Sequence, residues 1–103
     1  MSKRQGVVFS TAARDDLATI GDYIAADNPT RAESFVQELI DSCVGIEDMP
    51  RAFPLVPRYE DRGIRRRRHG RYLIFYRIDR ERVDILHILH GAQDYEWLLF
   101  PDG

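Results

Sequence analysis

Histidine is the side chain that titrates most readily near neutral pH, and this chain has three: His69, His87 and His90. Together with Tyr95 and Arg71, His90 could supply the acid, the base and the cation that cleavage of a phosphate ester requires. His87 and His90 are three residues apart, so strand alternation would send them to opposite faces. No two of these histidines have metal-ligand spacing with a third ligand nearby, so we expect no metal site.

A run of four arginines at positions 65–68 is the strongest candidate binding feature. Alternate side chains of a strand point to opposite faces, so Arg65 and Arg67 would share one face. Arg66 and Arg68 would share the other face. Three further arginines could extend one of these sets into a continuous patch: Arg62, Arg71 and Arg77. Such a patch would attract phosphates or an acidic partner, and the alternative is a charged edge strand that only prevents aggregation.

The net charge of −2 hides an uneven distribution. Residues 1–60 hold ten Asp and Glu against six Lys and Arg, which gives −4, whereas residues 61–103 hold nine Arg against seven acids, which gives +2. The segment 62–82 has nine Arg against two acids, or +7 in 21 residues. Charge of one sign concentrated in this way indicates a phosphate-rich or acidic partner.

The length of 103 residues predicts a single domain spanning 1–103. No stretch approaches the roughly 18 apolar residues that a membrane helix needs, and the polar N-terminus is not followed by the apolar segment of a signal peptide. Cys43 is the only cysteine, which favours the reducing cytoplasm. Cys43 also falls on an apolar helix face, where we expect a buried thiol.

Two amphipathic helices are predicted after a short strand at residues 7–9. The first helix is capped by Ser10 or Thr11 and runs to about residue 27, with Asp15 and Asp16 near the positive end of its dipole. The second begins at Asn28-Pro29 and ends near residue 48. The turn between them is so short that the helices must form an antiparallel hairpin.

A proline-containing loop at 49–63 precedes three predicted strands at 64–69, 72–79 and 83–90, and a short helix is expected around residues 94–100. The last two strands are apolar on both faces, so they should be central. The fold class is therefore α+β, in the order β-α-α-β-β-β, with the helical hairpin packed on a small, mainly antiparallel sheet. No segment remains for the other sheet face, and such a partly apolar, uncovered face usually binds a partner.

This order of elements and several motifs resemble the RelE/ParE toxin superfamily, in particular its ParE branch. The motifs are Val8-Phe9-Ser10 before the first helix, Asn28-Pro29, the segment 50–55, and Tyr-Arg-Ile at 76–78 followed by Val-x-Ile-Leu-x-Ile-x-His-Gly at 83–91. The resemblance covers residues 7 to about 100. No single motif is decisive, but their order and spacing together are fairly specific.

The resemblance implies the toxin of a type II toxin–antitoxin pair, which acts without a cofactor as an inhibitor of DNA gyrase. Its expected partner is a ParD-like antitoxin with an acidic tail that folds along the toxin, so the toxin would meet DNA only indirectly, through the antitoxin complex. It also implies a structural role for His90 at the end of its strand. The residues expected to bind the antitoxin or the target are Arg65, Arg66, Arg67, Arg68, Arg71, Arg77, Trp97 and Phe100.

Two other functions remain open at this point. RelE-type relatives cleave mRNA on the ribosome, and His90, Tyr95 and Arg71 would be the candidate catalytic set. This sequence lacks their lysine-rich active-site strand, because its only lysine is Lys3. The third hypothesis is a non-toxic family member that only binds its antitoxin. The apolar C-terminal segment 97–100 would either engage the target or pack back on the sheet.

Overall fold

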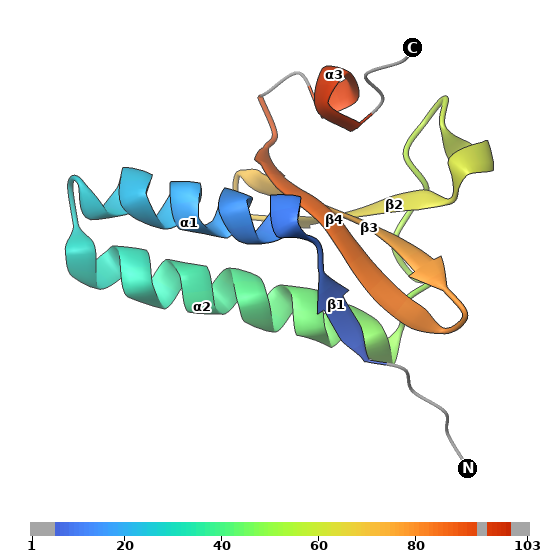
Figure 1. Ribbon diagram of the computed structural model, residues 1–103, viewed down its shortest axis with the longest axis horizontal. Helices are drawn as coiled ribbons and strands as arrows, with labels where there is room; N and C mark the ends of the chain where they lie inside the picture. The colour runs from blue at the N-terminus through green and yellow to red at the C-terminus, as the bar shows by residue number, and fades with distance from the viewer. Residues whose placement is uncertain (1–5, 93–94, 100–103) are drawn as a thin grey trace.

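Two long helices lie against one face of a four-stranded sheet in the computed structural model, which describes residues 6–92 and 95–99 (Figure 1). The elements in chain order are β1 (Val7–Phe9), α1 (Thr11–Ala25), α2 (Pro29–Gly45), η1 (Ile46–Asp48), η2 (Glu60–Arg62), β2 (Ile64–His69), β3 (Tyr72–Asp79), β4 (Arg82–His90) and α3 (Tyr95–Leu99). This order confirms the predicted α+β class. None of the helices in the described ranges is long and apolar enough to cross a membrane.

The strands are arranged in the order β1-β4-β3-β2. β1 pairs with β4 in parallel, and the other two pairings are antiparallel. β3 and β4 are therefore the central strands, as their apolar residues on both faces predicted. The arginine-rich strand β2 is an edge of the sheet, and its residues Arg65 to Arg68 pair with Tyr76 to Leu73 of β3.

Side-chain caps fix the starts of both long helices. The Ser10 hydroxyl accepts a hydrogen bond from the Ala13 amide at 2.9 Å, so Ser10 and not Thr11 is the cap of α1. The Asn28 carboxamide oxygen accepts from the Arg31 amide at 3.1 Å, and Pro29 occupies the first turn of α2. Both caps satisfy backbone donors that a helix start leaves without partners.

A first core cluster fills the space between the helices and the sheet. Its fully or almost fully buried members are Ala13, Ile20, Leu39, Cys43, Ile46, Ile74, Tyr76, Val83, Ile85 and Ile88. Tyr76 donates a hydrogen bond from its hydroxyl to the Pro50 carbonyl, which fixes the start of the proline-containing segment against the sheet. The helical hairpin thus buries its apolar stripes as predicted.

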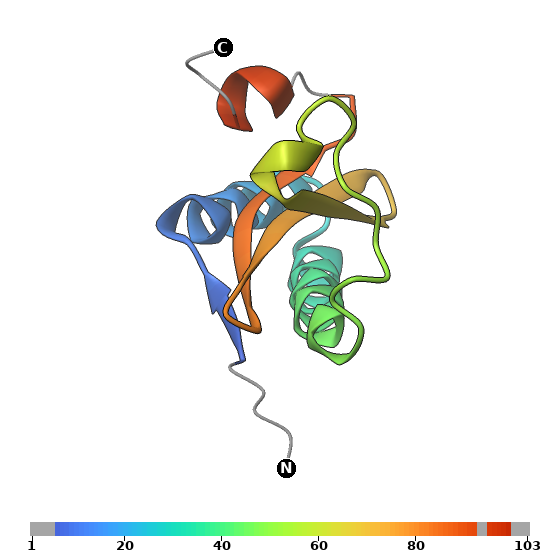
Figure 2. The same cartoon turned by 90° about the vertical axis from the view of Figure 1, so that its right-hand side faces the viewer.

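The expectation of an uncovered outer sheet face is wrong. A second cluster lies there, made of Val56, Ile64, Leu73, Phe75 and Leu89, with Tyr59, Leu86, Tyr95 and Leu99 packed against it. The segment between α2 and β2 runs along the sheet toward α3, and this segment and α3 together cover the outer face (Figure 2). Backbone bonds secure the segment, since the Val56 amide donates to the Ile64 carbonyl at 2.8 Å.

A register shift in the central hairpin changes which side chains share a face. Phe75 pairs with His87 and Tyr76 with Ile85, so one extra residue of β4 lies between these pairs. Ile85 and Ile88 consequently pack in the same core cluster although they are three residues apart. Simple alternation therefore does not hold across this bulge. His87 and His90 both follow the bulge and pair with Phe75 and Tyr72, so they lie on opposite faces as predicted.

The turn between β3 and β4 contains two residues whose backbone conformation lowers the stability of the fold. Arg80 and Glu81 have φ angles of +52° and +70°, a region that costs an ordinary L-residue about 1–2 kcal/mol. Asn-Gly is the preferred pair for such a hairpin turn. We expect Arg80→Asn/Glu81→Gly to raise the free energy of unfolding by about 1 kcal/mol, because the exposed Arg51–Glu81 ion pair that it removes contributes little. Urea titration would measure this, and lower stability would contradict it.

Burial of two weak acids predicts a loss of stability at high pH. Burial raises the pKa of Cys43 from 9.0 to about 12 and that of Tyr76 from 10.0 to about 12. Because both folded-state values lie above the unfolded ones, the unfolded chain releases these protons first. Their contribution to the free energy of unfolding is complete below about pH 9 and is lost as the pH rises toward 12. For Cys43 this loss amounts to roughly 2–4 kcal/mol.

Urea midpoints measured from pH 8 to pH 10.5 would test this dependence. Cys43→Ala is the comparison, since the substitution lowers stability at every pH but removes the thiol ionisation. We expect a flatter pH profile for the variant than for the parent chain. Equal slopes would show that the Cys43 thiol does not govern alkaline unfolding.

Candidate partner-binding surfaces

Arg65 and Arg67 point toward the helical side of β2 and bind backbone carbonyls. The Arg67 guanidinium donates to the Ser42 carbonyl in the last turn of α2 at 2.8 Å and lies 4.9 Å from the centre of the Phe53 ring. The Arg65 guanidinium donates to the carbonyls of Phe53 at 2.7 Å and Arg51 at 3.2 Å. A cation at a helix C-terminus is also attracted to the negative end of the helix dipole. These two arginines therefore tie β2 to α2 and to the loop.

Arg66 and Arg68 lie on the outer face, where they border a groove of about 400 Å³. Arg66 donates to the Tyr95 hydroxyl at 2.9 Å, and exposed Arg68 makes a long, 3.4 Å bond to the Gly70 carbonyl. In residues 6–92 and 95–99 neither guanidinium has a carboxylate partner. Phe53, Pro54 and Leu73 also line this groove. The arrangement suits an acidic group attached to an apolar one, because guanidinium binds carboxylate and phosphate in bidentate fashion.

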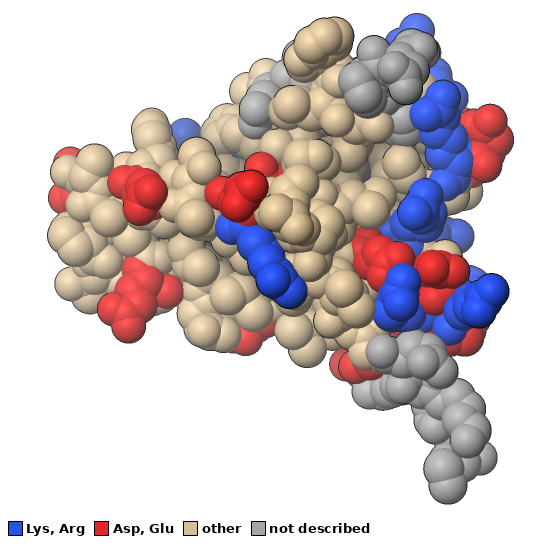
Figure 3. All heavy atoms as spheres, in the orientation of Figure 1, with Lys and Arg blue, Asp and Glu red and all other residues tan. Residues whose placement is uncertain are grey.

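Other arginines of the chain lie outside the groove of Arg66 and Arg68. Figure 3 shows Arg side chains at the end of the molecule that carries the η2 segment and the β3–β4 turn, where acidic side chains lie among them, and further acidic side chains over the helical hairpin. Arg71 and Arg77 are both exposed, yet neither lines the groove of Arg66 and Arg68. Arg71 borders a groove beside α1, and Arg77 borders another at the start of α1.

The groove beside α1 is larger and more apolar, with a volume of about 640 Å³. Tyr23, Phe35, Tyr72 and His90 line it, and Arg71 lies at its border. The Tyr23 side chain is 77% exposed, which is unusual for a large aromatic residue on a helix that packs on a sheet. A groove of this kind accepts the apolar face of a partner helix.

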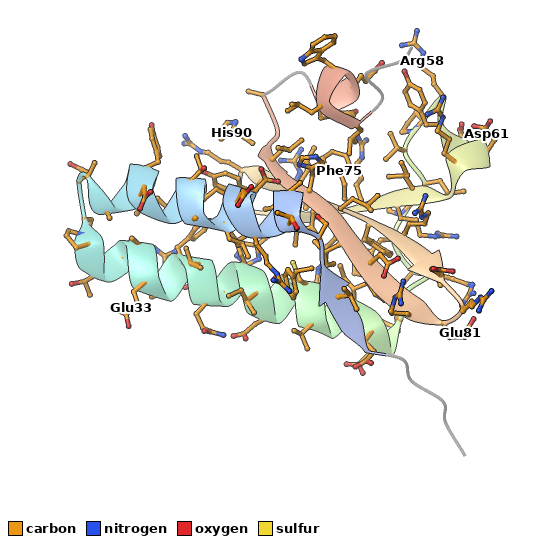
Figure 4. The ribbon with its side chains drawn as sticks, in the orientation of Figure 1. Glu33, Arg58, Asp61, Phe75, Glu81 and His90 are labelled. Carbon is orange, nitrogen blue, oxygen red and sulfur yellow. The ribbon has the colours of Figure 1, made fainter. Side chains whose placement is uncertain are left out.

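The structure separates the three residues of the hypothetical catalytic set. The His90 ring packs 5.4 Å from the Tyr72 ring, and its Nδ1 accepts a hydrogen bond from the Ala92 amide at 3.1 Å, as expected for a residue that holds the end of a strand. Tyr95 instead packs on Phe75 in the cluster of the outer face, at 4.9 Å between ring centres. Figure 4 shows His90 at the end of β4 and Phe75 within the sheet. Only His90 and Arg71 share a groove.

α3 has one partly buried side and one exposed side. Tyr95 and Leu99 pack on the sheet, while Trp97 is 68% and Leu98 37% exposed. Glu96 anchors the helix by accepting a hydrogen bond from the Tyr59 hydroxyl at 2.9 Å, which raises the pKa of Tyr59. Phe100, which the sequence placed in the same apolar segment, lies outside the described residues. Of the segment 97–100, Leu99 therefore packs back on the sheet and Trp97 is available to a partner.

Residues 7–95 match the family described as "ParE toxin of type II toxin-antitoxin system, parDE". The chain belongs to the ParE toxin family. None of the curated proteins compared with it matches its sequence.

Two solved toxin–antitoxin structures resemble this ParE-family chain. A chain of the chromosomal ParDE system from P. aeruginosa is 19% identical, with a TM-score of 0.71 over 86% of this chain and 98% of that one. A chain of the toxin–antitoxin complex RelBE2 from Mycobacterium tuberculosis is 28% identical, with a TM-score of 0.64 over 90% and 98%. The first likeness supports the fold, and the second places the chain within the wider superfamily. As a family member, the chain is a type II toxin whose partner is an antitoxin.

Two polar clusters of this ParE-family chain were missed by sequence reasoning. Asp16 accepts hydrogen bonds from His87 and from the Ile88 amide, instead of serving the α1 dipole. His69 Nδ1 lies 2.7 Å from the Ser42 hydroxyl, and its Nε2 lies 3.8 Å from a Glu38 oxygen. The partners in each cluster are 27 or more residues apart, so no local pattern indicated them. In the described parts of the chain, no group of three or more His, Cys, Asp or Glu side chains could hold a metal ion.

Proposed function

We propose that this ParE-family toxin acts in the cytoplasm by inhibiting DNA gyrase and is held inactive by a ParD-like antitoxin. The family match over residues 7–95 carries the proposal. The separation of Tyr95 from His90 and Arg71 supports a non-enzymatic inhibitor over a nuclease built on that set. The proposed mechanism is binding to gyrase so that cut DNA is not resealed.

The surfaces described above suit an antitoxin whose tail is acidic and folds on binding. The groove of Tyr23, Phe35 and Tyr72 provides an apolar binding surface for the tail, and the groove of Arg66 and Arg68 provides cations. A chain that crosses both would bury an apolar helix face at the first and neutralise carboxylates at the second. A ParD-like tail has this chemistry, and a RelB-like tail is the alternative within the superfamily.

A supercoiling assay with purified gyrase, toxin and antitoxin would test the proposal. The expected result is the accumulation of cleaved DNA with toxin alone and normal supercoiling when antitoxin is added in equal amount. A mixture of toxin and antitoxin assembled beforehand is the control for non-specific binding by a basic protein. Normal supercoiling at a large excess of toxin would refute the gyrase target.

A ribosome-dependent ribonuclease is the second candidate, and the likeness to the RelBE2 complex is the observation that favours it. The bond between Arg66 and the Tyr95 hydroxyl also places a cation beside a potential proton donor. Cleavage of mRNA in a purified translation system, abolished by Tyr95→Phe, would establish this function. A chain inactive in both assays but bound by its antitoxin would be the non-toxic binding module.

A further inference from the structure

A third groove opens at the start of α1. It is distinct from the groove that Tyr23 lines beside α1 and from the groove of Arg66 and Arg68. It has a volume of about 640 Å³ and lies over the outer face of the sheet, bordered by His87, Arg77 and Arg62. Leu86 and Leu98 provide apolar surface within it. Among the described residues that line it there is no aspartate or glutamate. The groove is therefore cationic and partly apolar.

A carboxylate on α1 orients the histidine of this groove. One oxygen of Asp16 accepts hydrogen bonds from His87 Nδ1 at 2.8 Å and from the Ile88 amide at 2.9 Å. Both side chains are mostly buried, at 20% and 19% exposure. The bond to the carboxylate fixes the ring proton on Nδ1, so Nε2 is the nitrogen left to interact with a ligand. Asp16 itself does not line the groove, and no partner of Nε2 occurs within the described ranges.

Arg77 supplies a cation that has no acidic partner in the part of the chain that the structure describes. Its neighbour across the strands is Asp84, but that carboxylate already binds Arg82 at 2.6 and 3.2 Å. Arg77 is exposed and forms no ion pair within the described residues. Arg62, at the border of the same groove, lies 5.8 Å from the Tyr59 ring centre.

We infer that this groove is a binding site for a phosphate monoester attached to an apolar or aromatic group, the chemical class of a nucleoside monophosphate. Arg77 binds two phosphate oxygens, and His87 Nε2 forms a hydrogen bond with a third. The base or other apolar group covers Leu86 and Leu98. The site does not depend on the proposed inhibition of gyrase, since neither His87 nor Arg77 lines the grooves assigned to the antitoxin.

The competing explanation is that Asp16 and His87 only tie α1 to β4. The bond from the Ile88 amide to Asp16 already makes that tie, and it requires no histidine. A structural tie would also leave Arg77 without effect on ligand binding. Arg77→Gln is thus the decisive variant, because Arg77 is exposed and its replacement leaves the Asp16–His87 pair intact.

Calorimetric titration of the full chain with AMP, adenosine and inorganic phosphate would test the site. We expect AMP to bind with a Kd on the order of 0.1–1 mM and inorganic phosphate at least tenfold more weakly, with adenosine weaker still. Arg77→Gln and His87→Gln should each weaken AMP binding at least tenfold. The matched control, Arg80→Gln, loses the same charge at the β3–β4 turn and should leave the affinity unchanged.

Imidazole ¹⁵N spectra give a readout that a structural tie would not change. In the parent chain we expect AMP to shift the His87 Nε2 resonance, and in Asp16→Asn we expect a different ring tautomer and weaker AMP binding in a folded protein. Equal binding by Arg77→Gln, His87→Gln and Arg80→Gln would overturn the site. Equal affinity for phosphate and AMP would overturn the role of the apolar surface. No AMP binding at about 10 mM, roughly ten to a hundred times the expected Kd, would overturn the proposal.

Discussion

Arg65→Ala/Arg67→Ala is expected to lower the melting temperature of the free toxin by roughly 10–20 °C. Each arginine donates to a carbonyl at 2.7–2.8 Å, and Arg67 also lies over the Phe53 ring. Hydrogen bonds from charged groups contribute about 1.5–3 kcal/mol each, and an exposed cation–π contact adds about 0.5–1 kcal/mol. Both side chains are partly solvent-exposed, so we discount the sum to about 2–4 kcal/mol.

Arg66→Ala/Arg68→Ala is the matched control for this loss of stability, because it removes the same charge from the same strand. It loses one bond to the Tyr95 hydroxyl and one long bond to the Gly70 carbonyl, so we expect a fall of about 1 kcal/mol or less. Thermal unfolding followed by circular dichroism would compare the two variants. Equal melting temperatures would refute the structural role of Arg65 and Arg67.

Most of the fold could be predicted because its signals are local. The cap residues Ser10 and Asn28 mark the two helix starts, and apolar residues on both faces identify β3 and β4 as central strands. The α1–α2 hairpin follows from the short turn alone. Each of these inferences rests on contacts between residues close in the chain or on the periodicity of one element.

The cover of the outer sheet face could not be predicted, because it depends on contacts between distant segments. The prolines of residues 49–63 indicate that this segment is not helical, but they do not indicate where Val56 packs. α3 is only five residues long, and its position depends on Tyr95 meeting Phe75 and on Glu96 meeting Tyr59. An uncovered sheet was the natural conclusion from element order alone, and two short segments were enough to reverse it.

The arginine strand illustrates the same limit at the candidate site. Alternation correctly assigned Arg65 and Arg67 to one face and the other two to the opposite face. It could not show that the first pair meets backbone carbonyls of α2 and the loop, whose positions are set by the tertiary fold. Partners in space, and not residue type, separate the arginines that stabilise the toxin from those left for a partner.

The outer arginines should therefore control binding and not stability. We expect Arg66→Ala/Arg68→Ala to weaken the affinity for the antitoxin on the order of 100-fold at low salt. The antitoxin carboxylates would lose two guanidinium groups that have no acidic partner within the described residues. The difference should shrink as salt rises from 50 to 500 mM, values at which the Debye length falls from roughly 14 to 4 Å. Binding kinetics on immobilised antitoxin at several salt concentrations would measure both effects.

Arg14→Ala/Arg80→Ala removes the same charge from α1 and from the β3–β4 turn, so it separates a specific contact from general attraction by a basic surface. If long-range attraction alone governs binding, both double variants slow association equally and leave dissociation unchanged. If the groove of Arg66 and Arg68 holds antitoxin carboxylates, only Arg66→Ala/Arg68→Ala speeds dissociation.

The variant Arg66→Ala/Arg68→Ala also tests whether the same arginines bind gyrase. Gyrase inhibition that survives the loss of antitoxin affinity would show that the toxin binds gyrase through another surface. Exposed Trp97 is then the first residue to change. Unchanged affinity and unchanged inhibition would remove the outer arginines from both interactions.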